Sequence, residues 1–103
     1  MAYRVILITT PTDKGEELAR FLVENKLAAC VNVVNRVKSI YWWQGKIEED
    51  SESLLIVKTS EDKVDELITK VKQVHPYTVP EIIALEIKEG NPDYLKWIDE
   101  SLR

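Results

Sequence analysis

The sequence is poor in cysteine, histidine and glycine, and each shortage excludes a class of site. The 103 residues include one cysteine and one histidine. One chain therefore cannot form an internal disulfide, and these two side chains alone cannot fill a tetrahedral metal site. The three glycines, Gly15, Gly45 and Gly90, are isolated, so no dinucleotide-binding fingerprint or P-loop is present. No nucleophile elbow is recognisable either. We therefore expect a protein that is not an enzyme.

The chain also lacks a basic cluster and a long apolar run. Its net charge is -4, with both signs interspersed, whereas nucleic acid and anionic membranes require clustered Lys and Arg. The N-terminal MAYRVILITT has no signal-peptide pattern, and its apolar run is far shorter than a membrane span. The single cysteine fits a reducing compartment. These features predict a cytoplasmic protein with neither nucleic acid nor a membrane as its partner.

The length and hydrophobic pattern predict one domain over residues 1–103. Runs rich in β-branched and aromatic residues predict strands at residues 3–10, 28–43, 54–59 and 81–87, with a hairpin turn at 44–45 and residues 46–53 returning from it. Helical periodicity predicts helices that follow Pro11, Ser60 and Asn91. Asp13, with Glu16 three positions later, resembles a capping box for the first of these helices.

The expected element order is β-α-β-β-α-β followed by a C-terminal helix. This order predicts an α+β, ferredoxin-like βαββαβ sandwich, in which two helices cover one face of an antiparallel sheet. The two middle strands extend into a long β-hairpin. A two-residue turn at Gln44 and Gly45 places Trp42 opposite Ile47.

Two adjacent tryptophans in the hairpin suggest an interface between subunits. Successive strand residues point to opposite faces, so Trp42 and Trp43 cannot both pack into one layer. Tyr and Trp are enriched in protein interfaces. We expect a homo-oligomer, and the alternative is a hairpin that is fully covered within one chain.

The segment VHPYTVPE, residues 74–81, contains the sole histidine. Pro76 disfavours a helical conformation for His75, which we expect to end the second helix in an extended conformation. His75 could serve as a metal ligand or proton carrier, but a structural role at the helix end is the more common one. Tyr77 and Glu81 adjoin the two prolines of this segment, Pro76 and Pro80. The segment is either a stiff crossover or the polar wall of a pocket.

Two other groups of residues are candidates for metal binding. Cys30 is more often a buried small apolar residue than a ligand, and a site built from it and His75 needs several copies of the chain. Glu48, Asp50 and Glu52 alternate on one strand face and could hold a hard cation. A charged edge that blocks further strand pairing is the more common role for such a pattern.

Five segments together resemble the CutA family of divalent-cation-tolerance proteins. They are KLAACVN (26–32), SIYWWQGKIEED (39–50), LLIVKT (54–59), VHPYTVPEIIALEI (74–87) and DYLKW (93–97). The resemblance implies a ferredoxin-like homotrimer assembled through its hairpins, cytosolic, and linked to tolerance of copper and other divalent cations. It makes His75 the best metal-ligand candidate, with Cys30 second. Two suggested copper ligands of some relatives, a Cys and a His, are replaced here by Ile8 and Val74.

The resemblance also implies a ligand cleft between subunits, around Trp43, Lys58, Tyr77 and Glu81, with Cys30 nearby. The leading hypothesis is a metal-binding or metal-response trimer. An alternative is a regulatory trimer resembling the PII signalling proteins, which bind small molecules in such clefts, with Lys58 as a possible anion contact. An acylphosphatase-like hydrolase would need a backbone phosphate cradle that this sequence lacks, and a trimer that only presents surfaces to other proteins is a further option.

Overall fold

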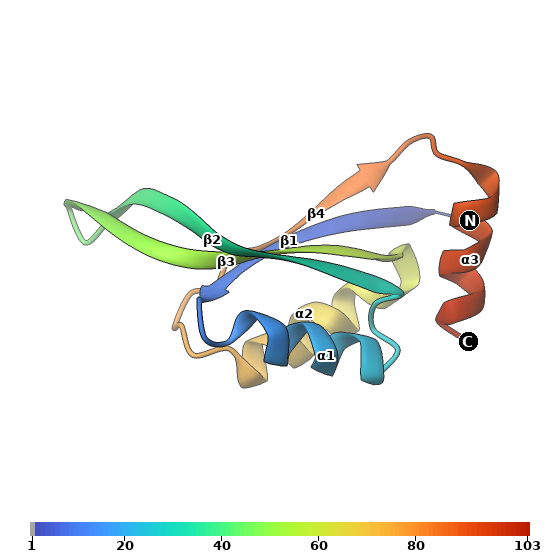
Figure 1. Cartoon of the computed structure of the whole chain (residues 1–103), viewed down its shortest axis with the longest axis horizontal. Coiled ribbons are helices and arrows are strands. Elements are labelled where there is room, and N and C mark those ends of the chain that lie inside the picture. Colours follow the sequence, from blue (N-terminus) through green and yellow to red (C-terminus); the bar gives the residue numbers. More distant parts are fainter. Residues whose placement is uncertain (1) are drawn as a thin grey trace.

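The computed structural model describes residues 2–103 and has the predicted element order. Its elements are β1 (Tyr3–Pro11), α1 (Gly15–Glu24), β2 (Cys30–Trp43), β3 (Lys46–Ser60), the short 3-10 helix η1 (Glu61–Lys63), α2 (Val64–Val74), β4 (Ile82–Ile87) and α3 (Pro92–Ser101). The four strands form one antiparallel sheet in the order β2-β3-β1-β4. Helices α1 and α2 cover one face, and α3 lies at one end (Figure 1). The predicted α+β, ferredoxin-like arrangement is confirmed.

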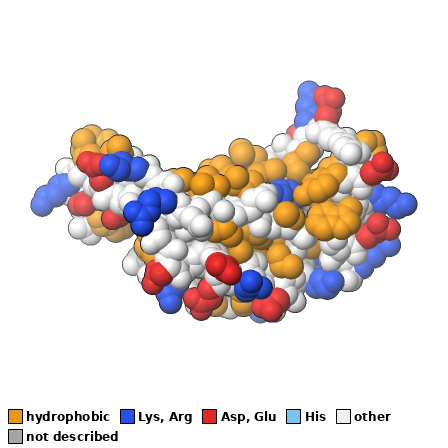
Figure 2. Space-filling model, in the orientation of Figure 1, with side chains coloured by type: hydrophobic (Ala, Val, Ile, Leu, Met, Phe, Trp, Pro, Cys, Tyr) orange, Lys and Arg blue, Asp and Glu red, His pale blue; other side chains and the backbone are white. Residues whose placement is uncertain are grey.

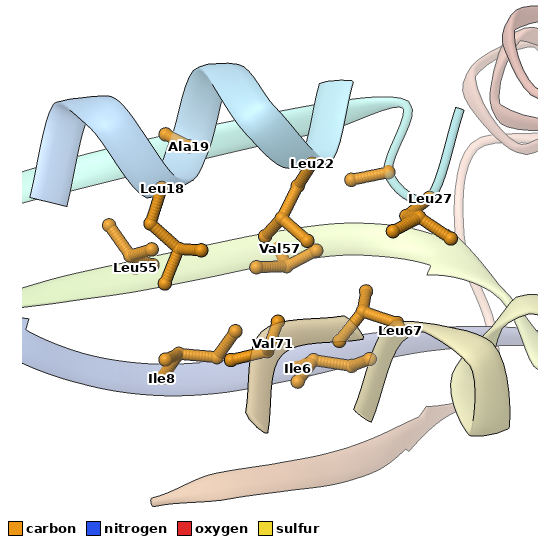
Figure 3. Close-up of a cluster of buried hydrophobic side chains, with 11 residues drawn as sticks. Ile6, Ile8, Leu18, Ala19, Leu22, Leu27, Leu55, Val57, Leu67 and Val71 are labelled. Atoms are coloured by element: carbon orange, nitrogen blue, oxygen red, sulfur yellow. The ribbon is translucent and has the colours of Figure 1, made fainter. Parts of the chain in front are cut away.

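The core lies between the sheet and helices α1 and α2 (Figure 3). Alternate residues of β1 and β3 point toward the helices, as the period of two in a strand requires. Their side chains meet apolar stripes on both helices that recur at helical spacing. The buried cluster includes Ile6, Ile8, Leu55 and Val57 from the sheet and Leu18, Leu22, Leu67 and Val71 from the helices.

The helix ends agree with the sequence in part. Asn91 caps α3, because its side-chain oxygen accepts a hydrogen bond from the Asp93 backbone N–H at 3.0 Å. His75 is extended, with φ -76° and ψ 136°, and terminates α2 as predicted. The capping box predicted for α1 is wrong: the helix begins at Gly15, and no side chain caps it.

The hairpin of β2 and β3 extends beyond the rest of the sheet (Figure 1). Strand β1 pairs with β3 only from Glu52 to Ser60, and the outer part of the hairpin pairs with itself alone. Gln44 and Gly45 both have positive φ, which suits a two-residue hairpin turn. The predicted pairing of Trp42 with Ile47 is confirmed. Residues 46–53 and 54–59, which were predicted separately, form one continuous strand. The pairing of β2 with β3 is irregular between Val34 and Val37, and no sequence pattern indicated this irregularity.

The face of the sheet opposite α1 and α2 carries exposed apolar side chains. Val34, Ile83 and Leu85 are 40%, 49% and 51% exposed. Figure 2 shows hydrophobic side chains gathered along this side of the sheet and next to α3. Helix α3 covers only one end of this face, where the Tyr3 hydroxyl donates to Asp99 Oδ2 at 2.5 Å. We call this surface the open sheet face.

Candidate functional site

Both ring nitrogens of His75 form hydrogen bonds, one to the sheet and one within the proline-containing loop. Nδ1 lies 3.1 Å from the Tyr77 backbone nitrogen, and Nε2 lies 2.8 Å from the Thr9 carbonyl oxygen. Because a backbone N–H can only donate, Nδ1 accepts that bond, and Nε2 must carry the proton donated to Thr9. His75 as a whole is 8% exposed. His75 is therefore held as the neutral Nε2–H tautomer, with no free ring nitrogen.

Tyr77 continues this connection from the loop to β3. Its hydroxyl donates to Glu52 Oε2 at 2.9 Å, and its ring centroid lies 4.8 Å from that of His75. Burial raises the pKa of Tyr77 above its ordinary value, and the hydrogen bond to Glu52 raises it further. Glu52 itself is 5% exposed. Two hydrogen bonds thus join the loop to the sheet, one to Thr9 of β1 and one to Glu52 of β3.

A cavity of about 710 Å³ lies between this loop and the outer hairpin. Tyr41, Trp43, Asp50 and Glu52 line it from the hairpin, and Tyr77 and Glu81 line it from the loop segment that precedes β4. The hairpin residues share one strand face, because the register pairs Tyr41 with Glu48 and Trp43 with Lys46. Trp42 and Ile47 therefore point to the opposite face.

The lining of the cavity is acidic. Asp50, Glu52 and Glu81 contribute carboxylates, and none of the described lining residues is Lys, Arg or His. The Tyr41 hydroxyl donates to Asp50, which raises the pKa of Tyr41 to about 12. The cavity therefore favours positive charge.

The structure brings together three of the four residues predicted for the ligand cleft. Trp43, Tyr77 and Glu81 line the cavity, whereas Lys58 does not. The Lys58 ammonium group donates to the Asn32 side chain and, at 3.3 Å, to the Ile56 carbonyl. An anion contact by Lys58 would therefore have to lie elsewhere on the protein.

The two predicted metal ligands do not share a site within one chain. Cys30 of β2 is half-buried and lies opposite Lys58 of β3, which in turn lies opposite Val5 of β1. His75 instead contacts Thr9 of β1. Four residues of β1 separate these positions, or about 13 Å along the strand. The thiol instead adjoins Tyr94, whose pKa is raised by burial and then by Cys30.

No metal centre is preformed in the described part of the chain. Among residues 2–103, no three His, Cys, Asp or Glu side chains are placed to hold one ion. Glu48, Asp50 and Glu52 therefore do not form the oxygen-ligand site considered from their spacing. Within the same residues, no helix is both long and apolar enough to cross a membrane.

Sequence reasoning identified the parts of the cavity without joining them. The alternating carboxylates and the position of Tyr77 were apparent, but nothing in the sequence linked Glu52 to Tyr77. The hairpin register was a usable signal. Once Trp42 is placed opposite Ile47, Tyr41 falls on the same strand face as Glu48, Asp50 and Glu52.

We predict that Tyr77→Phe destabilises the protein and flattens its pH dependence above pH 10. The variant leaves Glu52 without its donor, which costs about 1–3 kcal/mol of unfolding free energy at pH 8. The folded-state pKa of Tyr77 lies above its unfolded value of 10.0. The protonated Tyr77 hydroxyl therefore contributes its full stabilisation of the folded state below pH 10. That stabilisation is lost as the pH rises through the folded-state pKa.

Guanidinium denaturation between pH 8 and pH 12 measures both effects. Tyr41→Phe is the control, because its bond to Asp50 is exposed, and we expect it to cost less at pH 8. Equal stability of Tyr77→Phe and the unmodified protein at pH 8 would contradict a structural role for the Tyr77–Glu52 bond.

The sequence is similar to one family of known proteins along most of its length. A family model described as CutA1 divalent ion tolerance protein matches residues 4–101. The Divalent-cation tolerance protein CutA of Thermus thermophilus is 52% identical over 98 residues, covering 94% of this chain and 95% of that protein. A Protein CutA homolog of Xenopus laevis is 53% identical over 94 residues, 90% of this chain. This chain spans only 62% of the Xenopus relative's length.

Solved structures share the fold closely. The crystal structure of CutA1 from Oryza sativa has a TM-score of 0.96 at 47% identity, covering 100% of this chain and 95% of that one. A structure from Archaeoglobus fulgidus, named as a periplasmic divalent cation tolerance protein CutA, has a TM-score of 0.94 at 44% identity, covering 98% and 99% of the two chains. The family match over nearly the whole sequence, together with these relatives, establishes that the chain belongs to the CutA1 divalent ion tolerance family.

Proposed function

We propose that the chain works in the cytoplasm as a homotrimer linked to copper and other divalent-cation tolerance, without catalytic activity. Its membership of the CutA1 family supports the link to divalent cations. The observation that carries the assembly is the open sheet face, because an uncovered apolar sheet is rarely left in contact with water. Cell fractionation tests the location, since the Archaeoglobus fulgidus relative is named as periplasmic.

The outer hairpin adds to the surface available for assembly. Ile40, Trp42 and Ile47 are 64%, 72% and 62% exposed, although they are large and apolar. The hairpin extends past β1, so both of its long edges have unpaired backbone groups that another chain can bind. A second and a third copy of the chain would cover these groups and the open sheet face together.

We predict that native mass spectrometry finds three copies of the 11.9 kDa chain in one particle. Leu85→Lys should release monomers, because it places an ammonium group on the open sheet face. Glu86→Lys is the matched control, since the next residue in β4 points to the other face, and it should leave the trimer intact. A monomer or dimer for the unmodified protein would contradict the proposed assembly.

The residues of one chain do not complete a copper site. His75 has both ring nitrogens engaged, and a metal must displace either the Thr9 carbonyl from Nε2 or the Tyr77 N–H from Nδ1. Ile8 and Val74, where some relatives have a Cys and a His, offer no ligand atoms in their side chains. We therefore propose that copper binds weakly and that further ligands come from other copies in the assembly.

Copper titration by calorimetry tests this proposal. We predict weak binding by the unmodified protein and weaker binding by His75→Ala, because imidazole is the preferred ligand of Cu(II) among the residues near the loop. Cys30→Ser serves as the control for a thiolate site. Equal copper affinity for the unmodified protein and His75→Ala would remove His75 from the site.

A second candidate function is that of a regulatory trimer that binds a small molecule, as PII proteins do. The cavity beside the loop favours it, since its volume of about 710 Å³ falls within the range of small-molecule sites. Trp43, Tyr77 and Glu81 would then form the ligand cleft.

A further inference from the structure

The hairpin of β2 and β3 contains two pairing registers that differ by one residue. Near the core, Val34 of β2 lies opposite Leu54 of β3, and farther out Val37 lies opposite Glu52. Three steps along β2 therefore match two steps along β3, so β2 carries one extra residue, which is a β-bulge. The inner register belongs to the four-stranded sheet, and the outer one is set by the two-residue turn. The bulge joins these two registers.

The bulge also decides which side chains of the outer hairpin, residues 38–51, lie on which face. A shift of one residue moves every following side chain of a strand to the other face, and residues directly opposite each other share a face. Before the bulge, the even-numbered Val34 lies on the open sheet face. Beyond it, the odd-numbered Tyr41 and Trp43 lie on that side, and Trp42 lies on the other. Without the bulge, the two tryptophans would exchange sides.

Ser53 is the residue of β3 that lies opposite the bulge. It is fully buried, and its Oγ lies 3.2 Å from the Asn35 carbonyl oxygen and 3.3 Å from the Thr12 carbonyl oxygen. A serine hydroxyl has one proton, so the two carbonyl groups share it. Asn35 is in the bulge, and Thr12 is in the connection between β1 and α1. The Ser53 hydroxyl thus joins the bulge to this connection.

The start of α1 packs against the same serine. A Cβ atom at Gly15 would lie 2.7 Å from Ser53 Cβ and 2.9 Å from Ser53 Oγ, which is closer than such atoms tolerate. Only glycine allows the helix to approach so closely. The last pairing of β1 with β3, between Pro11 and Glu52, lies next to Ser53. The hairpin therefore leaves the sheet at the point where Ser53 contacts three other segments (Figure 1).

We propose that Ser53 is a positioning residue that holds the bulge in place and thereby fixes the direction and the faces of the outer hairpin. Its contacts with Asn35, Thr12 and Gly15 form what we call the Ser53 junction. An outer hairpin that swings or slips cannot present Trp42 to another copy of the chain in the same way. This consequence for assembly rests on the proposed trimer, whereas the fixing of the hairpin within one chain does not.

Amide hydrogen exchange of the full-length protein, measured by NMR, tests the proposal with Ser53→Ala. We expect the amides of the outer hairpin to exchange about tenfold faster, as the loss of a buried hydrogen bond predicts. Thr59→Val is the matched control, because it removes another fully buried hydroxyl of β3, which donates to the Leu27 carbonyl at 2.7 Å. Thr59 lies about 20 Å along the strand from Ser53. Thr59→Val should therefore leave exchange in the outer hairpin unchanged.

Gly15→Ala is a second variant in case Ser53→Ala fails to fold, because it keeps the hydroxyl and displaces it. For both variants we also expect the protein concentration at which the trimer dissociates, followed by native mass spectrometry on dilution, to rise about tenfold.

Two results overturn the proposal: unchanged outer-hairpin exchange together with unchanged trimer dissociation in both variants, or equal acceleration of outer-hairpin exchange by Thr59→Val. Faster outer-hairpin exchange in Ser53→Ala, with an unmodified protein that is monomeric, would support the Ser53 junction and contradict only the trimer. Failure of this inference and failure of the proposed assembly are therefore distinguishable.

Discussion

The two hydrogen bonds of the His75 ring are the constraint on which the candidate site depends. One bond ties the loop between α2 and β4 to the Thr9 carbonyl of β1, and the other orders the loop itself by accepting from the Tyr77 backbone N–H. This placement aims the Tyr77 hydroxyl at Glu52 in β3, and the loop becomes one wall of the cavity. Without this ring the connection would have few other ties, since the prolines restrict its backbone but do not position it on the sheet.

The same arrangement explains why a histidine so suggestive of metal binding is a poor ligand in one chain. Its ring nitrogens are already occupied, and burial leaves little room for an ion to approach. The chain's uncompensated negative charge lies instead in the cavity that this histidine helps to form. The acidic cavity and the open sheet face lie on the same side of the sheet, because Glu52 is two residues from Leu54, which pairs with Val34.

Local patterns predicted the fold well. The alternation of apolar residues fixed which faces of β1 and β3 are buried, and the two-residue turn at Gln44 and Gly45 fixed the hairpin register. Pro76 correctly indicated an extended His75. The capping box failed because α1 starts at Gly15, which makes Lys14 rather than Asp13 the N-cap residue.

The site was less predictable, because its contacts join distant parts of the chain. His75 and Thr9 are 66 residues apart, and Tyr77 and Glu52 are 25 apart. Such pairs are set by how helices and strands pack, for which one sequence holds no direct signal. The position of Lys58 outside the cavity follows from the same packing, and so does the separation of Cys30 from His75.

The tautomer of His75 tests this account most directly, and the chain's single histidine makes its assignment unambiguous. A long-range proton–nitrogen correlation NMR spectrum of the imidazole ring, recorded at about pH 8 where a histidine is ordinarily neutral, distinguishes the two ring nitrogens. The structure predicts a protonated Nε2 and an unprotonated Nδ1 in a single, unaveraged state. A proton on Nδ1, or rapid averaging between the two tautomers, would contradict the proposed anchoring of the loop.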